Sequence, residues 1–306
     1  MKSWVAVARW FDNSVGAQPV SKSEALDIDY VRSIPFLMLH LMCFAVIWVG
    51  WSWTAVIVAI SLYFLRMFAI TGFYHRYFSH RSFETSRWAQ FLFAAWGNTA
   101  VQKGPLWWAA HHRHHHRHSD KETDVHSPIT SGFFWSHIGW ITCKGNFTTN
   151  LKAVPDLAKY PELRFLDRFE TLVPILLATS LFGLGSLLQF WAPQLGTSGP
   201  QLLIWGFFIS TIVLFHGTCT INSLSHLIGK QRYRTSDESR NCLILALITL
   251  GEGWHNNHHH FPAAVRQGFY WWEIDITYYV LCLFSRIGLI WNLTPVPEAA
   301  RNTNRI

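Results

Sequence analysis

Two long stretches of the chain contain no charged residue at all. The first runs from Ser33 to Leu65 and the second from Thr171 to Gly229. A helix needs about 20 apolar residues to cross the hydrocarbon core of a bilayer, so each stretch, the first extended past Arg66, has room for two crossings. Glycine and proline mark the turn inside the second stretch. The pattern predicts two hairpins of membrane helices, with crossings near residues 34–50, 54–72, 171–190 and 201–221.

The composition agrees with a membrane protein. Of the 306 residues 50% are hydrophobic and only 14% are charged, which is too apolar for an ordinary soluble domain. Lysine and arginine collect on the cytoplasmic side of membranes, and here they lie outside the hairpin turns. Both termini and the segment between the hairpins are therefore expected in the cytoplasm. The net charge of +7 indicates contact with anionic lipid headgroups and no role in binding nucleic acid.

These elements predict an all-α integral membrane protein that forms a single domain over residues 1–306. Four transmembrane helices in two hairpins should carry a cytoplasmic helical cap. Apolar residues 86–110 and 274–293 are expected to lie along the membrane surface. The predicted segments are the first hairpin (33–72), a cytoplasmic segment (73–170), the second hairpin (171–221) and a second cytoplasmic segment (222–306).

Histidine boxes lie in both predicted cytoplasmic segments. The first has the spacing H-x4-H, and the second and third share the spacing H-x2-HH. Residues i, i+3 and i+4 of a helix share one face, so each triplet is expected to aim three imidazoles at one point. An asparagine and a histidine four residues apart, and so expected on one helical face, add a fourth element at the end of the last crossing. The residues are His75 and His80; His112, His115 and His116; His255, His258 and His259; Asn222 and His226.

This many histidines indicate a metal centre with two ions. Imidazole serves zinc, copper, iron and nickel alike, but a zinc site takes about four ligands. Two redox-active ions could activate O2, which makes iron the leading hypothesis. The five cysteines form no C-x-x-C pair, which argues against a disulfide framework. His40 and His216 stand alone in the crossings and are expected to be hydrogen-bonded structural residues.

Taken together, the boxes and their order around two hairpins resemble the membrane-bound fatty acyl desaturases of the stearoyl-CoA (delta-9) type, and bacterial members in particular. Shorter matches such as Glu122-Thr-Asp124 and Gly251-Glu-Gly-Trp-His255 support the resemblance over residues 33–275. It implies two iron ions held by the eight box histidines and His226, nine in all, with Asn222 acting through a water. It also implies O2-dependent formation of a cis double bond, at the delta-9 position of a long saturated acyl chain.

The same resemblance implies a bent, closed-ended acyl tunnel. Gln102, Trp108 and Thr218 occupy the positions that hold the bend in similar desaturases. Tyr63 and Met67, at the family's offset from the first box, would lie where the tunnel ends and limit the acyl length. Helix packing is the competing interpretation for all of these residues.

The sequence says less about the group that carries the acyl chain and about the electron donor. Acyl-CoA is the expected substrate, with acyl carrier protein and phospholipid as alternatives, because His111 stands where the acyl-CoA enzymes usually have Asp. The chain shows no iron–sulfur or dinucleotide motif, so an external carrier resembling ferredoxin, rubredoxin or cytochrome b5 is expected to dock on its basic surface.

Two other functions remain open from the sequence. Membrane hydroxylases and alkane monooxygenases also use histidine boxes, although their first box is typically H-x3-H. A metal transporter or sensor would place its ligands near the middle of the bilayer, where this chain has only His40 and His216.

Overall fold

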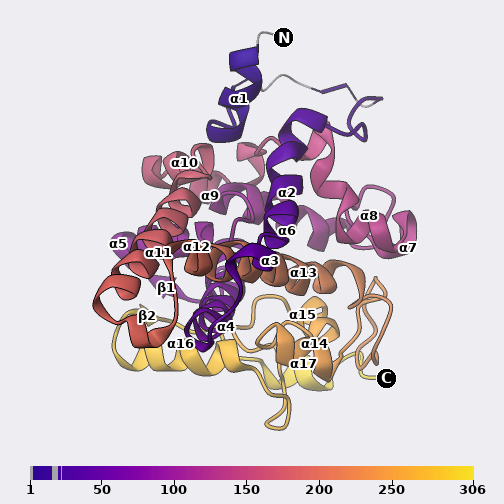
Figure 1. Ribbon diagram of the computed structural model, residues 1–306. Helices are drawn as coiled ribbons and strands as arrows, with labels where there is room; N and C mark the ends of the chain where they lie inside the picture. Colours follow the sequence, from indigo (N-terminus) through magenta and orange to yellow (C-terminus); the bar gives the residue numbers. More distant parts are fainter. Residues whose placement is uncertain (1–2, 16–19, 22) are drawn as a thin grey trace.

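Four apolar helices of the computed structural model are long enough to cross a membrane (Figure 1). The structure describes residues 3–15, 20–21 and 23–306. Within them the predicted crossings are confirmed, with ends that differ by a few residues. The observed spans are Tyr30–Val49, Trp53–Ser79, Leu172–Trp191 and Gly199–Ser223.

Three of the four spans are built from more than one helical segment, and the second and fourth spans combine α-helix with π-helix. The π-helical stretches admit an extra residue into the turn, which is frequent at functional sites. The first span contains α2 (Tyr30–Cys43) and α3 (Val46–Val49); the second α4 (Trp53–Phe68) and the π-helix η1 (Ala69–Ser79); the third is α11 (Leu172–Trp191); the fourth contains α12 (Gly199–Leu202), the π-helix η6 (Leu203–Ile209) and α13 (Ser210–Ser223).

The rest of the described chain is mostly short helices and one very small antiparallel sheet, which pairs β1 with β2. The elements are α1 (Ser3–Phe11), β1 (Glu84–Thr85), α5 (Arg87–Asn98), α6 (Pro105–His118), α7 (Pro128–Ser131), α8 (Phe133–His137), η2 (Gly139–Thr142), η3 (Lys144–Asn146), η4 (Leu151–Ala153), α9 (Pro155–Ala158), α10 (Pro161–Arg168), η5 (Pro193–Leu195), α14 (Leu243–Ile248), α15 (His255–His260), α16 (Ile276–Arg286), β2 (Ile290–Trp291) and α17 (Glu298–Asn302).

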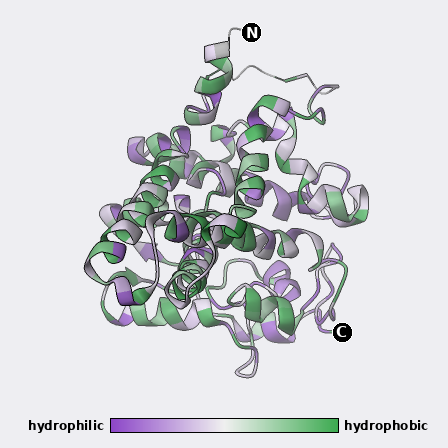
Figure 2. Cartoon of the chain, viewed as in Figure 1, coloured by the Kyte–Doolittle hydropathy of each residue, from purple (hydrophilic) through white to green (hydrophobic). Residues whose placement is uncertain are grey.

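Large apolar side chains remain uncovered along the spans. Trp48, Leu187 and Phe190 are more than half exposed, and Figure 2 shows hydrophobic residues over long parts of these helices. Exposure on this scale would be costly in water, whereas the acyl chains of a bilayer cover it. The molecule is therefore an integral membrane protein.

The interior is centred on η1. All eleven residues of this π-helix are buried, and Phe73 stacks on Phe93 of α5 with ring centroids 3.9 Å apart. The helix α6 also packs along η1, and Arg113 of α6 donates to the carbonyls of Phe78 and Ser79 at 2.8 and 2.9 Å. The first and second histidine boxes are consequently held against each other by the core.

Candidate metal centre

The first box lies on a π-helical turn. Sequence reasoning placed it after the second crossing, but the helix of that crossing continues as η1 through His75 to Ser79. The backbone N–H of His80 donates to the carbonyl of His75 at 3.2 Å, which is an i to i+5 bond. A π-turn brings residues five apart onto one side, so the spacing H-x4-H aims both rings in a similar direction.

The second and third boxes are helical, on α6 and α15, but neither triplet points at a single place. His112 and His116 turn toward the first box, whereas His115 turns away from it. In the third box His258 separates from His255 and His259 in the same manner. The expectation of three imidazoles converging from each triplet was wrong, because i, i+3 and i+4 fan across a face wide enough to serve two centres.

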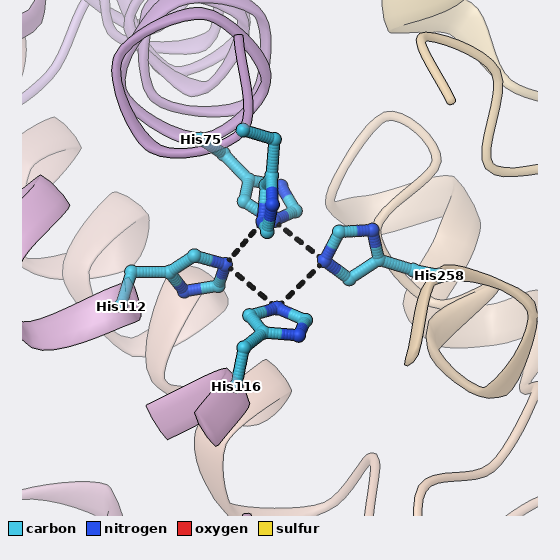
Figure 3. Close-up of side chains that lie close together, drawn as sticks. His75, His112, His116 and His258 are labelled. Carbon is cyan, nitrogen blue, oxygen red and sulfur yellow. Dashed lines mark hydrogen bonds between the residues drawn. The ribbon is translucent and has the colours of Figure 1, made fainter. Parts of the chain in front are cut away.

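The nine predicted histidines form two clusters, in each of which the ring nitrogens lie within 4.8 Å of one another. We call them cluster one and cluster two. Figure 3 shows four rings of cluster one turned toward a common centre. Cluster one contains His75, His80, His112, His116 and His258; cluster two contains His115, His226, His255 and His259.

The Nε2 atoms of cluster one meet at short range. Nε2 of His258 lies 3.0 Å from that of His75 and 2.9 Å from that of His116. Nε2 of His112 lies 2.8 Å from that of His80 and 3.0 Å from that of His116. A ring nitrogen carries either one proton or one lone pair, so neutral rings sharing these contacts cannot all be well paired. Converging lone pairs are what a metal cation satisfies.

Carboxylates stand behind four of the nine rings. Nδ1 of His115 donates to Asp124 at 2.9 Å, that of His226 to Asp120 at 2.8 Å, and that of His259 to Asp237 at 2.6 Å. His75 pairs with Glu252 in the same way. A proton held on Nδ1 leaves Nε2 as a lone pair facing the cluster, which is the arrangement seen around metal-bound histidines.

One buried nitrogen tests this fit directly. Nε2 of His259 is buried and has no hydrogen-bond partner among the described residues, although its Nδ1 is paired with Asp237. An unpaired polar atom in the interior is costly. A cation bound in cluster two would remove that cost, so the donor set fits a metal.

Burial also sets the protonation of the rings. Burial lowers the pKa of His112, His116 and His255 well below the usual range for histidine. It lowers the pKa of His259 to about 4. These histidines are therefore neutral at physiological pH, the form in which imidazole binds metal.

The predicted helical pair of Asn222 and His226 is divided by the end of a helix. Helix α13 stops at Ser223, and His226 lies in the turn that follows. His226 joins cluster two, whereas Asn222 lines the cavity described next, between His112 and His255. The expected common helical face is thus absent, and the turn supplies the approach of His226 instead.

A cavity in two parts runs past both clusters. Its outer part, of about 200 Å³, is bounded by α1, α2, α6 and α13. A smaller inner part of about 40 Å³ continues beyond the clusters. Trp108, His112, Thr218 and Asn222 line both parts, so the two meet beside the candidate metal centre.

The three residues predicted at the bend come together at this junction. Nε2 of Gln102 donates to Oγ1 of Thr218 at 2.9 Å, across 116 positions of sequence. The indole of Trp108 stacks on His112 with ring centroids 4.9 Å apart. The Thr218 end of the hydrogen bond and the Trp108 indole thus both belong to the lining that the outer and inner parts share.

The two residues predicted at the closed end are placed differently. Met67 lines the inner cavity. Tyr63 lines neither part; its hydroxyl donates to the carbonyl of Ile248 at 2.6 Å. Both side chains pack on Gly217, where a Cβ would lie 2.9 Å from the Tyr63 hydroxyl and 3.2 Å from Cε of Met67.

Sequence reasoning missed the carboxylates that orient the rings. Asp124 follows His115 by nine residues and Glu252 precedes His255 by three, so both lay inside the matched motifs. Asp120 and Asp237 gave less signal. Each carboxylate reaches a histidine of cluster one or two, and two of the four pairs, those of His226 and of His75, span more than 100 positions of sequence.

Comparison with known proteins agrees with this arrangement. Residues 51–281 match the fatty acid desaturase family. The chain is 35% identical to an sn-1 stearoyl-lipid 9-desaturase of Anabaena variabilis, over 90% of this chain and 97% of that protein. It is 35% identical to delta-9 acyl-lipid desaturase 1 of Arabidopsis thaliana, over 90% and 86%. It is 36% identical to acyl-CoA 5-desaturase AL21 of Anemone leveillei, over 82% and 75%. The chain belongs to the fatty acid desaturase family and is an oxidoreductase that acts on fatty acyl chains.

Proposed function

We propose that this protein binds two iron ions and uses O2 to insert a cis double bond at the delta-9 position of a long saturated acyl chain carried by a membrane glycerolipid. The observation that carries the proposal is the cavity whose two parts meet beside the two histidine clusters. Iron would supply the O2 activation needed to attack an unactivated CH2 group. The protein holds the metal, excludes water and positions the acyl carbons.

The proposed iron ligands are the nine clustered histidines, five for one ion and four for the other. Asn222 lines the cavity near both sets and is proposed to act through a water. Gln102, Trp108 and Thr218 are proposed to hold the bend. With the chain bent there, only a fixed stretch of it can lie beside the metals, which sets the position of the double bond.

A lipid-bound chain is preferred here over the acyl-CoA expected from sequence. Two of the relatives described above are named for acyl-lipid substrates, and one is named for acyl-CoA. The outer cavity is lined by Phe36 and Leu39 of the first span as well as by soluble segments. A site that borders a membrane helix suits a substrate already dissolved in the bilayer.

The electrons are proposed to come from an external carrier of the ferredoxin, rubredoxin or cytochrome b5 kind. Removing two hydrogens while reducing O2 to two waters requires two electrons and two protons from outside. The clusters and both termini are proposed to face the cytoplasm, where basic residues flank the spans.

The deciding experiment is the fatty-acid profile of a desaturase-deficient host. The chain, His258→Ala and His260→Ala would be expressed and compared by gas chromatography with localisation of the double bond. His260 is a matched control, because it follows the third box but its Nε2 contacts the carbonyl of Ala300 at 2.8 Å. We expect a delta-9 monoene from the chain and from His260→Ala, and none from His258→Ala.

The same fatty-acid profile would also show results that contradict the proposed function. Hydroxy acids in place of monoenes would assign the protein to the oxygenase alternative. A monoene that persists in His258→Ala would disprove the metal assignment. Labelled monoene that accumulates first in acyl-CoA would overturn the lipid-bound substrate.

A further inference from the structure

Three histidines outside the two clusters form a hydrogen-bonded chain through the first and last spans. Nε2 of His40 lies 3.2 Å from Nε2 of His216, and Nδ1 of His216 lies 3.0 Å from Nε2 of His137. The expectation that His40 and His216 are hydrogen-bonded is confirmed. The third member, His137 of α8, connects the pair to a segment outside the spans.

One set of tautomers satisfies this chain. Nδ1 of His40 lies 2.9 Å from the carbonyl of Phe36 and must donate to it. Nε2 of His40 therefore accepts from His216, and Nδ1 of His216 accepts from His137. All three rings are neutral in this arrangement, which suits residues at the edge of a bilayer.

The His40–His216 contact stands beside an aromatic pair. Phe36 precedes His40 by four residues, and Phe215 immediately precedes His216. Their rings meet edge to face with centroids 5.0 Å apart. Both phenylalanines line the outer cavity. The His40–His216 and Phe36–Phe215 contacts thus hold α2 against α13.

Helix α2 lines the outer cavity on one side and is exposed on the other. Arg32, Phe36 and Leu39 on one side line the cavity, whereas Leu37 and Leu41 on the other side are about half exposed. No residue of α2 is buried. The exposed side continues the lipid-facing surface of the spans, so this single helix separates the cavity from the bilayer.

The chain turns twice between α2 and α4. It turns at Phe44 and Ala45 between α2 and α3, and it turns again at Gly50, whose φ is +65°. A displacement of α2 can be absorbed at these turns without shifting α4, which carries on into the first histidine box.

We propose that α2 and α13 form a lateral gate through which the acyl chain of a bilayer lipid enters the cavity sideways. Opening separates Phe36 from Phe215 and His40 from His216. The headgroup stays at the membrane surface, near Arg32 and the Lys103–Glu170 ion pair of the outer cavity. The inference rests on the proposed function, since it assumes a lipid-bound substrate.

The test ties the gate shut. In a chain whose five native cysteines are replaced by serine or alanine, His40→Cys and His216→Cys would be bridged by a reversible bifunctional thiol reagent. The enzyme would be reconstituted in vesicles of 1-stearoyl phosphatidylcholine, reduced with dithionite, freed of reductant and exposed to O2 for a single turnover. Each single cysteine variant treated with the same reagent is the matched control.

We expect the bridge to lower monoene formation from the vesicle lipid at least tenfold, and dithiothreitol to restore it. An unchanged rate on the vesicle lipid would overturn the gate. A loss that dithiothreitol does not reverse, or an equal loss in a treated single cysteine variant, would show that the change distorts the cavity, and it would overturn the gate as well.

A second readout does not depend on iron or turnover. A phosphatidylcholine with a photoreactive diazirine on its stearoyl chain would be irradiated in the vesicles, and adducts mapped by mass spectrometry. We expect adducts near Thr218 that disappear when the gate is bridged. Such adducts without any monoene would sink the proposed function and leave the gate standing, while equal labelling with and without the bridge would refute the gate.

Discussion

The four carboxylates behind the histidine clusters decide which ring nitrogen faces inward. Asp124 illustrates the principle, since its Oδ2 accepts from Nδ1 of His115 at 2.9 Å and is fully enclosed. The side chain also accepts the backbone N–H of Asp120 at 3.0 Å. The backbone of Asp120 thus holds the carboxylate in the position from which it orients the His115 ring.

Asp124→Asn should weaken iron binding while leaving the fold intact. An amide is a poorer acceptor for Nδ1–H and loosens the tautomer of His115, and changes of this kind typically cost about 10–100-fold in metal affinity. The loss of affinity would be measured as the amount of iron that each protein retains against a graded series of chelators. Asp27→Asn is the control, because Asp27 lies away from the clusters and its carboxylate pairs with half-exposed Lys144 at 2.9 Å. Equal retention by both variants would contradict the orienting role.

Substitutions of Met67, which lines the inner cavity, and of Tyr63, which does not, should differ in their effect on the preferred acyl-chain length. Met67→Ala opens the space that Met67 lines and should shift preference toward longer chains, whereas Met67→Leu keeps the volume and should not. Tyr63→Ala should act in the same direction but less, because Tyr63 lines neither part of the cavity and its hydroxyl is bonded to the carbonyl of Ile248. Competition among palmitoyl, stearoyl and arachidoyl lipids would measure the shift, and no change in Met67→Ala would refute the assignment.

Among the elements, α6 depends on a cap supplied from another helix. Its own N-cap, Gly104, offers no side chain, and Oδ1 of Asp167 in α10 accepts from the N–H groups of Leu106 and Trp107 at 3.0 and 2.8 Å. A Cβ at Gly104 would lie 2.3 Å from that oxygen, so glycine is required by the close approach. The cap holds the helix that carries Trp108 and the second box.

The cap should make stability depend on pH. Burial raises the pKa of Asp167 from 3.8 to about 6, so the folded protein binds this proton more tightly than the unfolded chain. Stability is then greatest below the unfolded pKa and is lost as pH rises from about 4 to about 6, by up to about 3 kcal/mol. The Tm of the protein minus that of Asp167→Asn should fall across this window. A difference that stays flat would contradict it.

For the molecule as a whole, the spans and basic flanks predict which side carries the clusters. In a cysteine-free chain, Lys121→Cys near cluster two and Gln194→Cys in the turn between α11 and α12 are both exposed positions. A membrane-impermeant maleimide should label Gln194→Cys on intact cells and Lys121→Cys only after lysis. The reverse pattern would place the clusters on the outer side.

What the sequence determined by itself is what depends on neighbours along the chain. Absence of charge over residues 33–65 and 171–229 fixes four spans, because crossing a bilayer is a demand on composition and length. The spacing of the boxes likewise identified the nine histidines that meet in the structure. Neither conclusion needs contacts between distant residues.

Only the tertiary structure decided how those parts converge. It divided His115 from His116 between two clusters, brought Asp237 to His259, and joined Gln102 to Thr218 beside the cavity. It also replaced the expected helical pairing of His226 with a turn. These outcomes depend on the relative positions of η1, α6, α13 and α15, which packing of the core sets and local pattern does not record.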